Sequence, residues 1–175
     1  LEEDVTIPAE AAGVEGSSLY LKTGETVKLK TLLYGMLLHS GNDAATAVAL
    51  TCAGSLKAFA QKMNEKAQQL GMTNSHFTNP TGLDGEEHYS SAYDMALLAR
   101  ACLDVPELKE STATRSTTME GRTFVNHNKL LWRYEGCVGM KTGYTQAAGR
   151  TLVSAAERDG MTLIAVTLNA PSDWA

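Results

Sequence analysis

The spacing of apolar residues changes once along this chain, and this change limits the folds that the chain can adopt. From about residue 28 to 112 apolar side chains recur at helical spacing, as at Leu29, Leu32 and Met36. From about residue 114 to 170 they recur with a period of two, which is typical of strands. A helical part followed by a strand part predicts an α+β fold, with a helical cluster packed on an antiparallel sheet.

The helical part is divided by residues that end or begin helices. Ser40-Gly41-Asn42-Asp43 separates the first two helices, and its Asn or Asp is expected to cap the second one. Gly71 is a stop signal, Ser91 is a start signal, and the polar residues 73–87 between them predict a loop. We therefore expect helices over residues 30–39, 44–53, 55–70, 95–103 and 106–111.

The strand part begins with a hairpin and ends with three strands. Glu120-Gly121 is a suitable turn between strands over residues 115–119 and 122–126, and residues 127–132 connect onward. The last three strands are expected over residues 137–145, 149–157 and 161–168. Because no repeat or linker divides the chain, we expect a single domain over residues 1–175.

Composition excludes several classes of protein. Of the 175 residues 43% are hydrophobic and 20% charged, as in soluble globular proteins. A net charge of -5 without clustered Lys or Arg argues against nucleic-acid binding. Cys52, Cys102 and Cys137 have no metal-ligand or disulfide spacing, and we expect three free thiols among the core residues. The acidic start does not resemble a signal peptide and predicts a piece of a longer protein.

Two short motifs combine hydroxyl, amide and ammonium groups at the ends of predicted elements. One is Ser40-Gly41-Asn42 between helices, and the other is Lys141-Thr142-Gly143 on a strand. A Lys-Thr-Gly tripeptide is weak evidence alone, since Lys22-Thr23-Gly24 repeats it at a predicted hairpin turn. Only the copy at Lys141 follows the Ser-x-Asn element by a large part of the domain, and a pairing of this kind accompanies a Ser-x-x-Lys nucleophile in acyl-transfer enzymes.

Further segments extend this similarity over essentially the whole chain. Residues 32–47, residues 70–83, residues 126–132 and the run from Lys141 to Gly149 resemble the serine-type D-alanyl-D-alanine carboxypeptidases of peptidase family S11. These are the low-molecular-mass penicillin-binding proteins of bacterial cell walls. The resemblance implies a β-lactamase/transpeptidase-like fold, with a helical part over about residues 28–112 and a sheet part over about 114–170.

The chain departs from that family in one respect. No serine in the 175 residues has lysine three positions later, so the nucleophile motif is absent from this sequence. In the family this motif begins a helix that would lie just upstream of Leu1, and a C-terminal helix would follow after Trp174-Ala175. The resemblance therefore implies a catalytic domain truncated at both ends, which we expect to be unable to form an acyl-enzyme by itself.

The resemblance implies catalytic roles for three residues. In the family a serine activated by its lysine attacks the carbonyl between the terminal D-alanines of a peptidoglycan stem peptide, and water hydrolyses the resulting ester. Ser40 would relay a proton to the leaving amine, Asn42 would hold the substrate backbone, and Lys141 would supply a second cation. The alternatives are a helix cap for Ser40, a cap or turn residue for Asn42, and a solvated strand lysine for Lys141.

The residues after Lys141 would bind substrate. Thr142 resembles a carboxylate-binding hydroxyl, Gly143 would let the substrate backbone approach, and the Tyr144 N–H would form half of an oxyanion hole. Thr145 is a second candidate for the carboxylate. Strict alternation sends Lys141 and Thr142 to opposite faces, so one cleft can use both only by wrapping the edge of the strand.

His127 is the remaining candidate, since family members carry basic residues in this segment near the substrate carboxylate. The alternative is a histidine packed beneath Trp132.

The resemblance implies no cofactor or metal. Implied partners are a stem peptide and, for the intact enzyme, β-lactam antibiotics; attachment to the membrane would be peripheral, through a C-terminal region.

The implied setting is outside the cytoplasmic membrane, in cell-wall biogenesis and cell shape. Two rival functions stay open. One is a non-catalytic module that binds wall peptide, which the missing Ser-x-x-Lys favours. The other is a β-lactamase of the same fold, which would release a penicillin adduct quickly instead of holding it for minutes.

Overall fold

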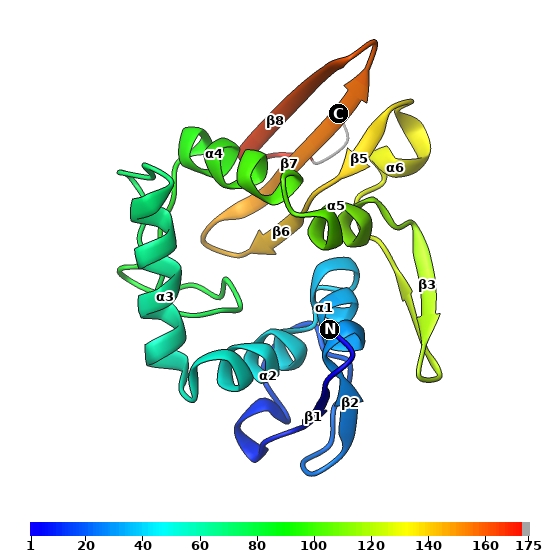
Figure 1. Cartoon of the computed structure of the whole chain (residues 1–175). Coiled ribbons are helices and arrows are strands. Elements are labelled where there is room, and N and C mark those ends of the chain that lie inside the picture. Colours follow the sequence, from blue (N-terminus) through cyan, green and yellow to red (C-terminus); the bar gives the residue numbers. More distant parts are fainter. Residues whose placement is uncertain (173–175) are drawn as a thin grey trace.

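Helices form an arc around one side of a twisted antiparallel sheet (Figure 1). The computed structural model describes residues 1–172, so the expected chain end at Trp174-Ala175 lies outside the described residues. The helices are α1 (Leu29–Leu38), α2 (Asn42–Ala53), α3 (Leu56–Gln69), α4 (Ala92–Leu103), α5 (Pro106–Ala113) and the short α6 (Leu130–Arg133), with a 3-10 turn at Ala9–Ala11. The α+β prediction is confirmed.

Over residues 1–172 the strands form three sheets. Two are hairpin-like pairs, β1 (Asp4–Thr6) with β2 (Thr26–Lys28) and β3 (Ser116–Met119) with β4 (Arg122–Val125). The third has β7 (Gly149–Arg158) at its centre. β8 (Met161–Ala170) pairs with one edge of β7, and β5 (Cys137–Gly139) and β6 (Thr142–Thr145) pair one after the other with its second edge. Within residues 1–172, β6 pairs only with β7, so its other edge is free.

Packing between α4 and the sheet forms one core. Ala99 of α4 is buried with Val153 and Ala155 of β7, and Ile164 and Val166 of β8 pack against them. Residues directly opposite each other on neighbouring antiparallel strands share a face, as Val153 and Val166 do. This α4-facing side of the sheet is also the side that receives Lys141, described below.

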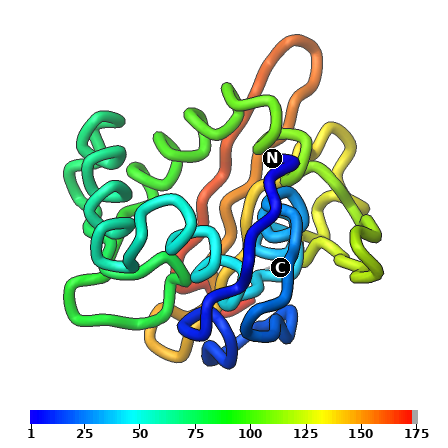
Figure 2. Tube along the Cα trace, turned by 60° about the horizontal axis from the view of Figure 1, so that its bottom comes forward, coloured from blue at the N-terminus to red at the C-terminus, as the bar shows by residue number. Residues whose placement is uncertain are grey.

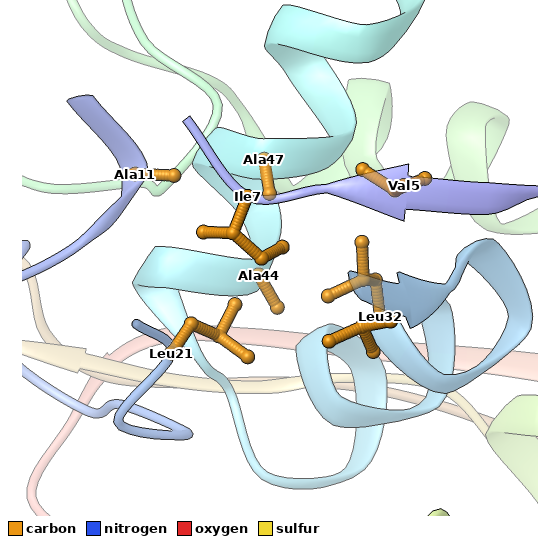
Figure 3. Packing of buried hydrophobic residues seen from close by; sticks show 8 residues of the cluster. Val5, Ile7, Ala11, Leu21, Leu32, Ala44 and Ala47 are labelled. Carbon is orange, nitrogen blue, oxygen red and sulfur yellow. The ribbon is translucent and has the colours of Figure 1, made fainter. Parts of the chain in front are cut away.

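A second core holds α1 and α2 together (Figure 3). Ile7 and Leu32 are almost completely buried there, and Ala44 and Ala47 of α2 let the segments approach closely. Full burial of a side chain such as Ile7 contributes about 1.5–3 kcal/mol. This packing fixes the α1–α2 junction, which contains Ser40. In Figure 2 the N-terminal strand passes across the two helices.

Several local predictions are confirmed by hydrogen bonds or backbone angles. The Ser55 and Ser91 hydroxyls cap α3 and α4 by accepting from the N–H groups of Ala58 and Asp94. Gly71 follows α3 with a φ of +77°. The Lys22-Thr23-Gly24 copy lies at a turn, where the Gly24 N–H donates to the Ile7 carbonyl at 2.8 Å.

Three local predictions are wrong. No Asn or Asp side chain caps α2, because the N-cap is Gly41 and Asn42 and Asp43 already lie inside the first turn. The strand expected over residues 137–145 is interrupted between β5 and β6. The three cysteines are free and Cys102 packs against the core formed by α4 and the sheet, but Cys52 is exposed and Cys137 is only half-buried, because residue type alone does not determine which face of a helix or strand a neighbour covers.

Asp43 instead anchors a distant segment to the α1–α2 junction. Its fully buried carboxylate accepts the N–H groups of Leu19 and Leu21 and the hydroxyl of Ser18, at 2.6–3.1 Å. Three donors from residues 18–21 thus depend on one side chain. Nothing in its sequence surroundings distinguishes this role from that of a cap.

Asp43→Ala is expected to lower the free energy of unfolding by about 3 kcal/mol, because it leaves the buried N–H of Leu21 and the half-buried donors of Ser18 and Leu19 without this acceptor. Urea denaturation measures this change. Asp104→Ala, at an exposed aspartate, is the control and should change stability by less than about 0.5 kcal/mol. A loss below about 1 kcal/mol for Asp43→Ala would contradict the anchoring role.

Candidate functional site

The α1–α2 junction turns so sharply that Ser40 adopts a left-handed backbone, with a φ of +59°. Such a conformation is uncommon for a residue other than glycine and is held in place by its surroundings. The next residue must be small, since a Cβ on Gly41 would lie 1.9 Å from a methyl group of Leu19. The junction therefore holds the half-buried Ser40 in a defined position between two packed helices.

The break between β5 and β6 positions the second motif. Gly139 and Met140 both have positive φ angles, +102° and +88°. A Cβ on Gly139 would lie 2.0 Å from the carbonyl oxygen of Thr112, so α5 crosses the strand too closely for any other residue. The Met140 side chain is buried in the α4 core. Regular pairing resumes at Lys141, which exchanges both backbone hydrogen bonds with Val153 at 3.0 and 2.9 Å.

Lys141 and Ser40 meet at this point, although they are 101 positions apart. Since Lys141 is opposite Val153, its side chain leaves the sheet on the α4-facing side. The Lys141 ammonium donates to the Ser40 Oγ and, at 2.6 Å, to the carbonyl oxygen of Thr142. The two motifs picked out in the sequence therefore form one polar contact.

This contact rules out the simplest alternatives for both residues. Ser40 does not cap α2, and Lys141 is not a solvated strand lysine. Burial lowers the pKa of the Lys141 ammonium from 10.5 to about 8. The side chain is thus still largely protonated at pH 7, but its proton is easier to remove than that of an exposed lysine.

A cavity of about 1340 Å³ opens beside the Ser40–Lys141 contact. Residues 79–83, Tyr89 and Trp132 form parts of its wall. Every residue proposed from the sequence as a site residue lines it: Ser40, Asn42, His127, Lys141, Thr142, Gly143, Tyr144 and Thr145. The candidate residues predicted from the sequence therefore come together in one cavity.

The free edge of β6 faces this cavity. Lys141 and Val153 form a hydrogen-bonded pair, so by alternation Thr142 and Tyr144 belong to non-hydrogen-bonded pairs. Their backbone N–H and C=O groups therefore point away from β7, toward the edge. The Thr142 carbonyl is free to accept from Lys141 for this reason, and the Tyr144 N–H is oriented for a ligand at the edge. Strand alternation sends the Lys141 and Thr142 side chains to opposite faces of the sheet, so one cleft can use both only if it wraps around the strand edge. The cavity lies at this edge and is lined by both residues.

His127 contributes a neutral ring to the site. Partial desolvation lowers its pKa, and the nearby His39 and Lys141 lower it further. The His39 and His127 rings lie 5.5 Å apart between centroids. Because the pKa is below 6.5, His127 is a hydrogen-bonding group at pH 7, not a second positive charge.

Two predicted residues already have partners in this structure. The Asn42 amide donates to the Glu15 carbonyl at 2.7 Å and is almost fully buried. The Thr145 hydroxyl donates to an oxygen of Asp84 at 2.6 Å and accepts from the Ala148 N–H at 2.9 Å. A substrate carboxylate would have to displace the Asp84 contact in order to bind Thr145.

Sequence reasoning missed the residues that hold His127 in place. Asn128 is fully buried, and its amide donates to the Gly139 carbonyl and the Ser154 hydroxyl at 3.1 and 3.0 Å. Asn126 is also buried and donates to the carbonyls of Thr112 and Thr114. The sequence does show an Asn on each side of His127, which could have indicated a supported histidine. Only the structure shows that both Asn side-chain amides donate hydrogen bonds to neighbouring segments.

Comparisons with known proteins agree over nearly the whole chain. Residues 1–172 match the family described as Peptidase S11, D-alanyl-D-alanine carboxypeptidase. The chain is 41% identical over 175 residues to the D-alanyl-D-alanine carboxypeptidase DacF of Bacillus subtilis, with 97% of this chain and 45% of that protein covered. The chain thus spans about half the length of the curated relatives that it matches.

Solved structures show the same similarity. Penicillin binding protein 6B from Escherichia coli superimposes with a TM-score of 0.91 at 36% identity, covering 98% of this chain and 57% of that one. A mutant of a Streptomyces DD-transpeptidase superimposes with a TM-score of 0.94 at 31% identity, covering 98% of this chain and 74% of that one.

Proposed function

Because the chain belongs to the D-alanyl-D-alanine carboxypeptidase family, peptidase S11, we propose that it forms part of a serine D-Ala-D-Ala carboxypeptidase. Such an enzyme removes the terminal D-alanine from peptidoglycan stem peptides through an acyl-enzyme. The observation that carries this proposal is the contact between Lys141 and Ser40 beside the free edge of β6. The nucleophilic serine and its lysine would come from outside these 175 residues.

Lys141 and Ser40 act together in the proposed reaction. The nucleophilic serine would give its proton to its own lysine, its oxygen would bond to the carbonyl carbon between the D-alanines, and the C–N bond would then break. The departing amine needs a proton, which Ser40 gives up while Lys141 supplies the nearby positive charge and restores the proton. A lysine with a pKa of about 8 suits this exchange better than one at 10.5, because its proton moves more readily near neutral pH.

The free edge of β6 supplies substrate binding. An extended peptide would lie along this edge, with Gly143 allowing close approach of its backbone. The outward Tyr144 N–H would stabilise negative charge on the carbonyl oxygen during attack. The Thr142 hydroxyl and the Lys141 charge would attract the terminal carboxylate of the substrate. Asn42 and His127 would lie beside the substrate peptide as neutral hydrogen-bonding groups.

The proposal extends to partners and place. β-Lactams would acylate the same serine as the stem peptide does, and the enzyme would work on the outer side of the cytoplasmic membrane. Within residues 1–172 none of the helices has both the length and the apolar character that a bilayer crossing requires. Peripheral attachment through a further region stays a prediction.

A chimera tests the proposed function. A helix carrying Ser-x-x-Lys is joined in front of Leu1, and the purified protein is incubated with a fluorescent penicillin. We expect a covalent adduct that lasts for minutes, with no labelling when the added serine is changed to alanine. Release within seconds would favour a β-lactamase, and absence of labelling in a folded chimera would favour a non-catalytic wall-peptide-binding module.

A further inference from the structure

Hydrogen bonds join the two sides of the loop between α3 and α4, both at its base and further along it. We call residues 76–89 the strap. Its base is closed by His76 and Tyr89, whose backbones exchange two hydrogen bonds of 2.9 Å. Further along, the Thr78 N–H donates to the His88 ring at 3.0 Å. The Asn79 side chain accepts the N–H groups of Thr81 and Gly82. These bonds give a long polar loop a defined shape.

The strap passes beside the proposed active site. Residues 79–83 line the same cavity as β6 and the turn that follows it. The strap is the green loop between α3 and α4 in Figure 1, and its wide excursion is also clear in Figure 2. One part of the cavity wall is therefore a loop, and another part is the edge of a strand.

The charged side chain of Asp84 joins the strap to the end of β6. Asp84, exposed on the strap, accepts a 2.6 Å hydrogen bond from the hydroxyl of Thr145, 61 positions away. Thr145 is the last residue of β6, and its hydroxyl also accepts from the Ala148 N–H in the turn after β6. A carboxylate acceptor makes the Asp84 bond stronger than a bond between neutral groups. The contact thus links the strap, the end of β6 and the turn.

We propose that Asp84 is a positioning residue for the reaction, acting through Thr145. By holding the Thr145 hydroxyl it fixes the distance between the strap and the free edge of β6, and so the orientation of the Tyr144 N–H next to it. This inference rests on the proposed function, because the distance that Asp84 fixes matters only if a substrate peptide binds in this cleft. It also removes Thr145 from the set of groups that bind the substrate carboxylate.

The rival role for Thr145, direct binding of the carboxylate, makes opposite predictions. If Asp84 and Thr145 act as one unit, losing either partner has the same effect and losing both adds nothing. If Thr145 binds substrate directly, removing Asp84 frees its hydroxyl and improves binding, whereas removing Thr145 weakens it.

A double-mutant cycle in the chimera separates these possibilities. The rate constant for acylation by a fluorescent penicillin is measured together with kcat and KM for a peptide ending in D-Ala-D-Ala. Asp84→Ala and Thr145→Val are each expected to lower kcat/KM about tenfold, and the double variant should fall no further than either single variant. Additive losses, or faster reaction in Asp84→Ala, would overturn the inference.

Conservative variants and a neighbouring acid distinguish positioning from a general loss of structure. Asp84→Asn keeps an acceptor oxygen and Thr145→Ser keeps the hydroxyl, so both should retain at least about a third of the kcat/KM. Glu86 is an exposed carboxylate on the same strap, and Glu86→Ala should leave the rate within about twofold. A tenfold loss in Glu86→Ala would mean that strap charge, not the Asp84 contact, matters.

Amide hydrogen exchange on the 175-residue chain tests the contact without any activity. Asp84→Ala should speed exchange in peptides that cover residues 79–84 and 145–149, since both sides of the contact lose a constraint. Unchanged exchange overturns the inference whatever the chimera does. Faster exchange with a chimera that is never labelled overturns the proposed function and upholds the contact.

Discussion

Ser40→Ala in the Ser-x-x-Lys chimera is expected to slow acylation by a fluorescent penicillin about 10²–10⁴-fold, the usual loss when a proton-transfer group is removed. Ser40 carries the hydroxyl that accepts from Lys141, and the other acceptor of this ammonium, the Thr142 carbonyl, has no proton to relay. The rate is measured from the growth of the labelled band with time. A loss of less than about tenfold would contradict the relay role.

The conformation of Ser40 calls for a second variant. Alanine keeps the unfavourable positive φ angle of +59°, whereas Ser40→Gly removes the hydroxyl and relaxes the backbone. Both variants should lose the same activity if the hydroxyl is what matters, and Ser40→Gly should remain at least as stable as the unsubstituted chimera. Ser116→Ala, on an exposed strand away from the cavity, is the matched control and should react normally.

Lys141→Met is expected to abolish labelling of the chimera and yet to raise the free energy of unfolding of the chain at pH 7 by about 1–2 kcal/mol. Burial of the ammonium is unfavourable, as its pKa of about 8 shows. The penalty for a shift from 10.5 is on the order of 3 kcal/mol, and losing the donor to Ser40 and Thr142 offsets part of the gain.

The same shift predicts how stability depends on pH. Between pH 8 and 10.5 the unfolded chain binds the Lys141 proton and the folded chain does not, so stability rises with pH across this window. Below pH 8 both states are charged and the penalty is fully present. The difference in unfolding free energy between Lys141→Met and the unsubstituted chain should therefore shrink, and then reverse sign, as pH rises from 7 to 10.5.

Urea denaturation at several pH values measures this difference, and the comparison cancels the titration of all other groups. Lys62→Met, at an exposed lysine on α3, is the control and should show no such dependence. A constant difference between Lys141→Met and the unsubstituted chain from pH 7 to 10.5 would mean that the pKa of Lys141 is not depressed.

The sequence by itself determined the kind and order of the elements. Apolar residues recur at helical spacing up to α5 and with a period of two after it, because the geometry of a helix or strand decides which side chains share a face. This pattern is visible without a fold. Ser55 and Ser91 were identifiable as caps for the same reason, because each bonds to a residue three positions away. The order of the two motifs led to the family that the comparisons found.

Tertiary structure alone decided how these elements meet. The contacts that define the site join residues 101 positions apart, Ser40 with Lys141, and 61 apart, Asp84 with Thr145. At the break before Lys141 the Thr112 carbonyl lies so close that only glycine fits at Gly139, and no local pattern encodes the path of another segment. Periodicity depends on neighbours along the chain, whereas a cleft depends on where distant segments are brought together. The sequence therefore determined which residues carry the chemistry of the site, and the fold determined which of them touch.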